Sequence, residues 1–194
     1  AKMFSAIIFI KRISGAQVTL SGGTYTGREN GIAVAGTLDA GSRVAVAGAT
    51  IVGSAESGLV FGAFSDDVNS AAVSVSGGAI TGRSLGVTFS GQLNPGTAVS
   101  LTDVAIAGTA DYGLHFKMGV LGARVSVAGG SCEGGKIGVA FGRATDAAAS
   151  IALHRVAAVL SAAHLGHSSG CQQGATALDA VPAAAFMAIA LSQV

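Results

Sequence analysis

The chain has 194 residues, of which 38 are Ala and 30 are Gly; half of it is hydrophobic, while 5% is aromatic and 11% is charged. This composition excludes a disordered chain, which is poor in apolar residues and rich in charge, and two Pro residues exclude collagen. A net charge of +1 without Lys or Arg clusters predicts no nucleic-acid partner, and no stretch of about 20 apolar residues predicts a membrane-spanning helix.

In chain order, residues 1–16 come first, and their apolar run at residues 7–10 predicts an incomplete coil or an N-terminal cap. Residues 17–168 then contain five copies of one segment in which apolar residues alternate before a Gly-rich turn. The copies begin 26, 29, 26 and 26 residues apart, at Val18, Val44, Val73, Val99 and Val125. A weaker copy begins at Ile151 and a seventh is traced from Thr176, so residues 169–194 are predicted to be a degenerate last coil or a C-terminal cap.

A second motif follows each strong copy and consists of Gly, an apolar residue, any residue and a bulky residue. It occupies residues 31–34, 58–61, 86–89, 113–116 and 138–141. Alternation of apolar residues is the period of a strand, and self-similarity at this length is typical of solenoids. We therefore predict an all-β fold, a right-handed parallel β-helix of six to seven coils with about 26 residues and three short strands per coil.

Two inward columns follow from this alignment. The second strands predict the column Tyr25, Ile51, Ile80, Ile106 and Cys132. The third strands predict the column Val34, Phe61, Phe89, Phe116 and Phe141. Residues of one column stack about 4.8 Å apart, which is the spacing between neighbouring strands.

The recurring pattern Val-x-Val-x-Gly-Gly-x-Ile-x-Gly followed by Gly-Val-x-Phe, at residues 74–91 and 126–142, resembles the passenger region of pertactin-like bacterial autotransporters. The resemblance implies a secreted β-helix at the bacterial cell surface that acts without catalysis as an adhesin or interaction scaffold. It also implies a host surface protein or glycan as partner, and no cofactor. Two alternatives remain open: a carbohydrate-active β-helix, such as a polysaccharide lyase or tailspike-like protein, and a structural protein that self-associates through its nearly uncharged surface.

Carboxylates gather at two places in the predicted coils. One set of acids shares the turn between the second and third strands: Glu29, Glu56 and Asp111. A solvated corner is the simpler interpretation of this set. The loop at residues 63–71 carries the other set, in which Asp66, Asp67 and Asn69 are weak candidates for cation binding and are more simply a polar surface insertion. No residue is predicted to be catalytic.

The remaining candidates are His and Cys residues. His164, His167 and Cys171 have a spacing that suits a metal, but no fourth ligand is evident, so we interpret them as part of a degraded repeat. Cys132 is predicted to be a small core residue, and its pairing with Cys171 would require the last coils to deviate. His115 lies between inward residues and is predicted to face outward as a surface residue.

Overall fold

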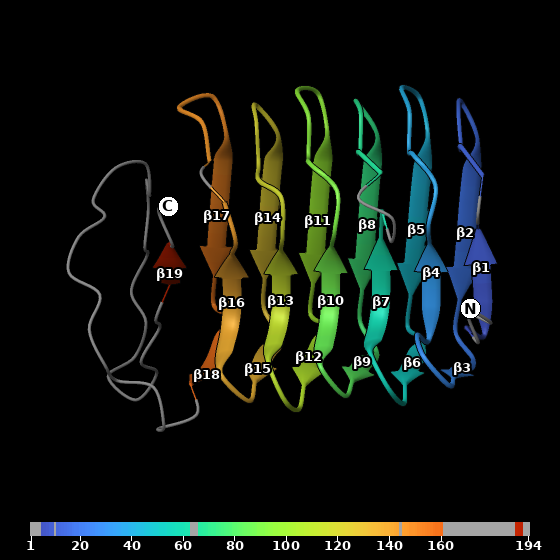
Figure 1. The fold of residues 1–194 in the computed structure, drawn as a ribbon, viewed down its shortest axis with the longest axis vertical. Helices are drawn as coiled ribbons and strands as arrows, with labels where there is room; N and C mark the ends of the chain where they lie inside the picture. Colours follow the sequence, from blue (N-terminus) through green and yellow to red (C-terminus); the bar gives the residue numbers. More distant parts are fainter. Residues whose placement is uncertain (1–4, 10, 63–65, 144, 161–188, 192–194) are drawn as a thin grey trace.

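The protein is a parallel β-solenoid whose coils of about 26 residues stack along one axis in about six turns (Figure 1). The computed structural model describes residues 5–9, 11–62, 66–143, 145–160 and 189–191. The described residues form strands and turns, and none of them belongs to a helix that could span a membrane. The all-β solenoid predicted from the repeat is therefore confirmed.

Each coil contributes one strand to each of three parallel sheets. The first strands are β2 (Gln17–Ser21), β5 (Arg43–Ala47), β8 (Ala72–Ser76), β11 (Ala98–Thr102), β14 (Arg124–Ala128) and β17 (Ser150–His154). The second strands are β3 (Thr24–Gly27), β6 (Thr50–Gly53), β9 (Ala79–Gly82), β12 (Ala105–Gly108), β15 (Ser131–Gly134) and β18 (Ala157–Leu160). The third strands are β1 (Ile7–Phe9), β4 (Ile32–Val34), β7 (Ser57–Phe61), β10 (Leu85–Phe89), β13 (Tyr112–Phe116), β16 (Ile137–Phe141) and β19 (Ile189–Leu191).

The three sheets enclose one narrow core. In Figure 1 the third strands lie in front of the first strands and run in the opposite direction, while the short second strands close the lower edge. Alternate residues of the first strands point inward, so β5, β11 and β14 alternate between buried and more exposed positions. Because every interior strand pairs with the coil before and the coil after it, the backbone register fixes which side chains stack on each other.

Both predicted columns are present in the strand register. Each member of the second-strand column, from Tyr25 to Cys132, pairs with the equivalent residue of the next coil. In the third strands, successive rings of Phe61, Phe89, Phe116 and Phe141 stack with centroids 4.9, 5.1 and 4.9 Å apart. The structure adds Phe9 to this column through the pairing of β1 with β4, so residues 7–9 form the third strand of an incomplete coil.

The second corner, between the second and third strands, requires glycine because the backbones approach closely. A Cβ added to Gly82 would lie 1.8 Å from the carbonyl oxygen of Leu85, and one added to Gly86 would lie 2.5 Å from Cγ2 of Ile106. Four other coils have a glycine in the position of Gly82, namely Gly27, Gly53, Gly108 and Gly134, whereas the coil that contains β18 has Leu160 there. Neither Gly82 nor Gly86 has positive φ, so lack of space, rather than an unusual backbone angle, explains this part of the repeat.

The first corner, between the first and second strands, has a different requirement. Gly48 follows β5 with a φ of 60°, and the equivalent residue of the coil that contains β11 is Asp103, with a φ of 52°. An L-residue pays a steric cost in this left-handed region, although Asp tolerates it better than most residues. The sequence therefore departs from its own repeat at a residue where the backbone does not change.

The third corner carries an inward column that the repeat motifs omit. Single-residue bridges join Ile13, Leu38, Val68, Leu93, Val120 and Thr145 from coil to coil. Leu38, Val68, Leu93 and Val120 are at most 1% exposed, so this column closes the core at the upper edge of Figure 1.

Candidate functional site

The outer face of the third-strand sheet contains a groove that crosses several coils. Outward positions of β4, β7, β10, β13 and β16 form one column in the register: Ala33, Val60, Thr88, His115 and Ala140. Val60, Thr88 and His115 from this column line a cavity of about 360 Å³. Thr88 is only 2% exposed and Val60 4% exposed, although both lie on the outer side of the sheet. These positions therefore form the floor of a recess rather than a flat surface.

One wall of the groove comes from the turn between the second and third strands. In this turn, one residue of each coil donates a backbone hydrogen bond of 2.8–3.1 Å to the equivalent residue of the coil before it. These residues form the column Glu29, Glu56, Ser84, Asp111 and Lys136. The three acids grouped by the sequence thus do share a column, with Ser84 between two of them. Glu56, Ser84 and Asp111 line the groove together with Asn30, Ser57, Leu85 and Tyr112, and Ser90 and Lys117 also line it.

The wall residues differ in whether they already form ion pairs or hydrogen bonds within the protein. Nζ of Lys136 lies 2.6 Å from Oδ1 of Asp111 and forms an ion pair with it. The hydrogen bond to this carboxylate raises the pKa of Lys136. The amide oxygen of Asn30 accepts a hydrogen bond of 3.1 Å from the backbone N–H of Ser57. Asn30 therefore holds two coils together at the buried end of the wall, while Glu56 is exposed at the rim.

Two aromatic rings pack against each other at one part of the groove. The rings of Tyr112 and His115 have centroids 4.6 Å apart and are inclined by 35°. Burial lowers the pKa of His115, the charge of Lys117 lowers it further, and Asp111 opposes both effects. The imidazole is therefore neutral at pH 7, with one ring nitrogen able to donate a hydrogen bond and the other able to accept one.

Two buried polar atoms in the groove have no hydrogen-bond partner within the protein: Oγ1 of Thr88 and Nδ1 of His115. Among the described residues, the only other such side-chain atom is Oγ of Ser5, which lies outside the groove lining. Buried polar atoms are normally paired, because an unpaired one loses its hydrogen bonds to water without compensation. Both atoms belong to side chains of the groove lining, and both are shielded from solvent in this structure.

Two of the three candidate cation ligands in the loop before β8, Asp67 and Asn69, belong to a hydrogen-bond network between coils. We call this network the polar ladder (Arg12, Asp39, Asp67, Asn69, Gln92 and Asn94). The side-chain amide of Asn94 donates a hydrogen bond of 2.6 Å to Oδ1 of Asn69. The backbone N–H of Gln92 donates a hydrogen bond of 3.0 Å to Oδ1 of Asp67. Asn69 in turn donates to Asp39, which also pairs with Arg12. The carboxylate and amide oxygens of Asp67 and Asn69 are thus bonded across coils.

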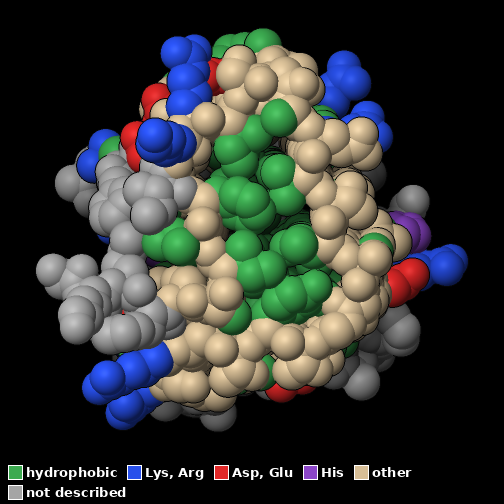
Figure 2. Space-filling view, turned by 90° about the vertical axis from the view of Figure 1, so that its right-hand side faces the viewer, with side chains coloured by type: hydrophobic (Ala, Val, Ile, Leu, Met, Phe, Trp, Pro, Cys, Tyr) green, Lys and Arg blue, Asp and Glu red, His purple; other side chains and the backbone are tan. Residues whose placement is uncertain are grey.

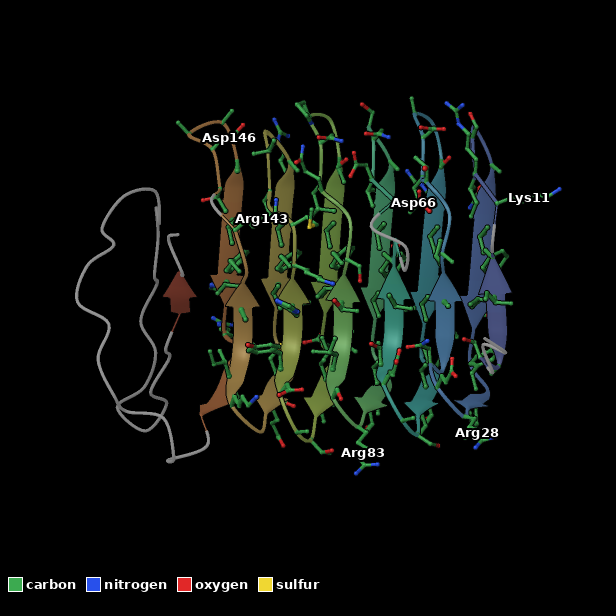
Figure 3. The ribbon with its side chains drawn as sticks, in the orientation of Figure 1. Lys11, Arg28, Asp66, Arg83, Arg143 and Asp146 are labelled. Carbon is green, nitrogen blue, oxygen red and sulfur yellow. The ribbon has the colours of Figure 1, made fainter. Side chains whose placement is uncertain are left out.

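The other predicted candidates lie elsewhere. Figure 3 places Asp66 beside the upper part of the solenoid, away from the lower corner of the coils. No group of three or more His, Cys, Asp or Glu within the described ranges could hold a metal ion. His164, His167 and Cys171 lie outside the described residues. Cys132 is a free thiol that is 1% exposed, and burial raises its pKa to about 12.

Sequence reasoning found the acids of the groove wall and the outward position of His115, but it missed Thr88 and Tyr112. A signal for them was present. The residue that precedes the bulky end of the second motif is outward in every coil, and it changes from Val60 to Thr88 to His115. The depth of the recess could not be derived from the pattern, because it depends on neighbouring side chains from three coils.

No protein-family model matches the chain, and comparison with curated proteins and with solved structures gave no match either. The function therefore has to be argued from the groove and from the surfaces around it.

Proposed function

We propose that the protein is a non-catalytic interaction scaffold, secreted or displayed at a bacterial cell surface, that binds a partner in the groove of its third-strand sheet. The observation that carries this proposal is the groove itself, whose floor and walls come from successive coils in fixed register. Backbone pairing holds the lining, so the site is formed before a ligand arrives, and binding requires little ordering of the protein. The resemblance of the repeat to pertactin-like passengers supports the location and the adhesin-type role.

The experiment compares binding of the parent and of two matched variants to intact host cells. Ser84→Trp places a large ring in the wall of the groove, whereas Ser100→Trp places the same ring on the exposed outer face of β11. We expect Ser84→Trp to lose binding and Ser100→Trp to keep it, with both variants folded by circular dichroism. Equal binding by Ser84→Trp and the parent would contradict the proposal. Release of shortened glycans from the cell surface would favour the carbohydrate-active alternative instead.

A second candidate function is self-assembly, and the N-terminal end of the solenoid favours it. Figure 2 shows apolar side chains gathered at the centre of this end, surrounded by backbone and polar groups. Val18, Leu20 and Tyr25 pack against the core there but remain partly exposed, and within the described ranges β1, β2 and β3 each pair with a strand on one side only. A free strand edge beside exposed apolar side chains is a template for another strand.

The occupant that fits this end is the same end of a second copy, because that end carries the same partly exposed apolar side chains. Two copies joined in this way would each cover Val18, Leu20 and Tyr25 of the other. Sedimentation velocity tests this: the parent should form larger species as concentration rises, and Leu20→Glu should not. A monodisperse parent at high concentration would contradict self-assembly.

A further inference from the structure

We propose that the groove binds a neutral oligosaccharide, with one sugar ring against Tyr112 and His115 and with its hydroxyl groups bonded to Thr88 and His115. This inference rests on the proposed function, because it names the partner class of the same groove. Four observations lead to it: the unpaired polar atoms in the floor, the aromatic pair, the charge of the walls and the absence of a free strand edge beneath the groove.

The floor supplies the first observation. The side chain of Thr88 has almost no contact with solvent, and its hydroxyl has no partner in the protein. Valine has the same shape without the hydroxyl, so an apolar floor would avoid the cost of burying that group unpaired. Threonine at this depth is accounted for when the partner comes from a ligand. A ligand hydroxyl offers both the donor and the acceptor that these two atoms lack, and it reaches them when the side chains of Thr88 and His115 turn toward the groove, since both atoms are shielded in the free protein.

The aromatic pair supplies the second observation. Tyr112 and His115 are both partly exposed, and their rings pack against each other in the groove lining, so each ring offers a ligand the surface that the other leaves uncovered. A pyranose ring has apolar C–H faces and a polar edge of hydroxyl groups. Packed on these rings, it would bury its apolar face while its edge points toward Thr88 in the floor and toward the walls.

The walls supply the third observation. The acidic residues Glu56 and Asp111 lie on one side of the groove, and the lining also contains the positively charged Lys117. Asp111 is also neutralised by Lys136. Carboxylates and serine hydroxyls accept hydrogen bonds from sugar hydroxyls. With Asp111 paired to Lys136 and Glu56 offset by Lys117, the lining carries no net positive charge that would attract the carboxylate of a uronic acid. The lining therefore favours a neutral sugar over a polyanionic one.

The sheet supplies the fourth observation, which separates a glycan from a peptide. An extended peptide commonly binds by adding a strand to a free sheet edge. The strands beneath the groove are β7, β10 and β13, and each of them pairs with a neighbouring strand of the same sheet on both sides. They therefore offer no backbone hydrogen bonds to a ligand. Recognition here must come from side chains alone, and most of the polar side chains in the lining bond well to hydroxyl groups.

The test is titration calorimetry of the full chain with neutral tetrasaccharides of glucose, mannose, galactose and xylose, with tetragalacturonate as the charged comparison. Thr88→Val removes one hydroxyl at constant shape, and we expect it to weaken binding roughly tenfold. Tyr112→Ala should weaken binding by at least that factor. Thr19→Val on the exposed face of β2 and Tyr25→Ala at the N-terminal end are the matched controls, and both should bind like the parent.

The outcomes distinguish this inference from the proposed function. Binding of a neutral tetrasaccharide that both groove variants weaken and both controls preserve would support the inference. Equal binding by Thr88→Val, Tyr112→Ala and the parent, or stronger binding of tetragalacturonate, would overturn it. Absence of any saccharide binding, combined with loss of cell binding in Ser84→Trp, would overturn the glycan assignment and leave the groove as a site for another partner.

Discussion

Replacing Phe89 with Ala removes the central ring of the stacked column. Phe89 is 1% exposed, and its ring lies 4.9 Å from that of Phe61 and 5.1 Å from that of Phe116. Truncation of a buried Phe costs about 3–5 kcal/mol, since apolar contact is lost and a cavity remains. We expect the upper part of this range because the backbone of β10 is paired on both sides and cannot collapse into the space. A typical domain is stable by only about 5–15 kcal/mol, so the effect is a large fraction of the total.

Urea unfolding followed by far-UV circular dichroism measures this loss, with Phe9→Ala as the matched control. Phe9 occupies the same column, but it lies on the edge strand β1, is only partly buried and pairs with Val34 alone. The same chemical change should therefore cost less than half as much there. A loss below about 1 kcal/mol for Phe89→Ala, or equal losses for the two variants, would refute the assignment of this column as the rigid centre of the core.

Three further predictions concern the corners and the buried thiol. Gly82→Ala should destabilise the protein by several kcal/mol in the same assay, because its Cβ would overlap a carbonyl oxygen, whereas Gly48→Ala, with no heavy atom within 4 Å, should lose about 1–2 kcal/mol from its positive φ alone. Asp103→Gly should leave stability unchanged or raise it by up to about 1 kcal/mol, since it relieves a left-handed backbone angle at a small entropic cost; a clear loss would contradict the assigned conformation. The raised pKa of Cys132 stabilises the fold fully below about pH 8.5, and that contribution should fall by up to about 1.4 kcal/mol per pH unit as pH rises toward 12. Unfolding at several pH values, in a Cys171→Ser background, should show a steeper alkaline loss for the parent than for Cys132→Ala.

The fold could be predicted from the sequence because, in a solenoid, the residues that contact each other occupy equivalent positions of successive repeats. Residues that stack on one another are about 26 positions apart, so aligning the copies also aligns the columns, and Ile80 above Ile51 follows without any knowledge of structure. The two corners also left signals, since both depend on glycine. What the alignment missed was the bridge column of Leu38, Val68 and Leu93, whose members are spaced unevenly and lie outside both motifs.

The site was harder to predict for a physical reason. Columns and register place Glu56 and Asp111 on one wall, but the depth of the groove depends on how side chains from β7, β10 and β13 shield its floor. Thr88 is an ordinary outward residue in the sequence and becomes unusual only through its burial and its unpaired hydroxyl. Likewise, the sequence shows Asp67 and Asn69 only as weak candidates for cation binding, and the hydrogen bonds that they accept from the backbone of Gln92 and the amide of Asn94 appear only in the structure.

Function is therefore best sought where the repeat changes while the backbone does not. Inward columns keep their chemical type, as the stacked rings from Phe61 to Phe141 show, because any other side chain would leave a cavity or an unpaired polar group. An outward column has no such constraint, yet the one through the groove changes from Val60 to Thr88 to His115 and buries polar atoms that the coils themselves leave unpaired. Stability alone gives no reason for that exchange, since an all-valine column would pair as well and avoid the desolvation cost. A ligand that supplies the missing hydrogen bonds gives such a reason, and it applies to the coils of the groove and to no interior column.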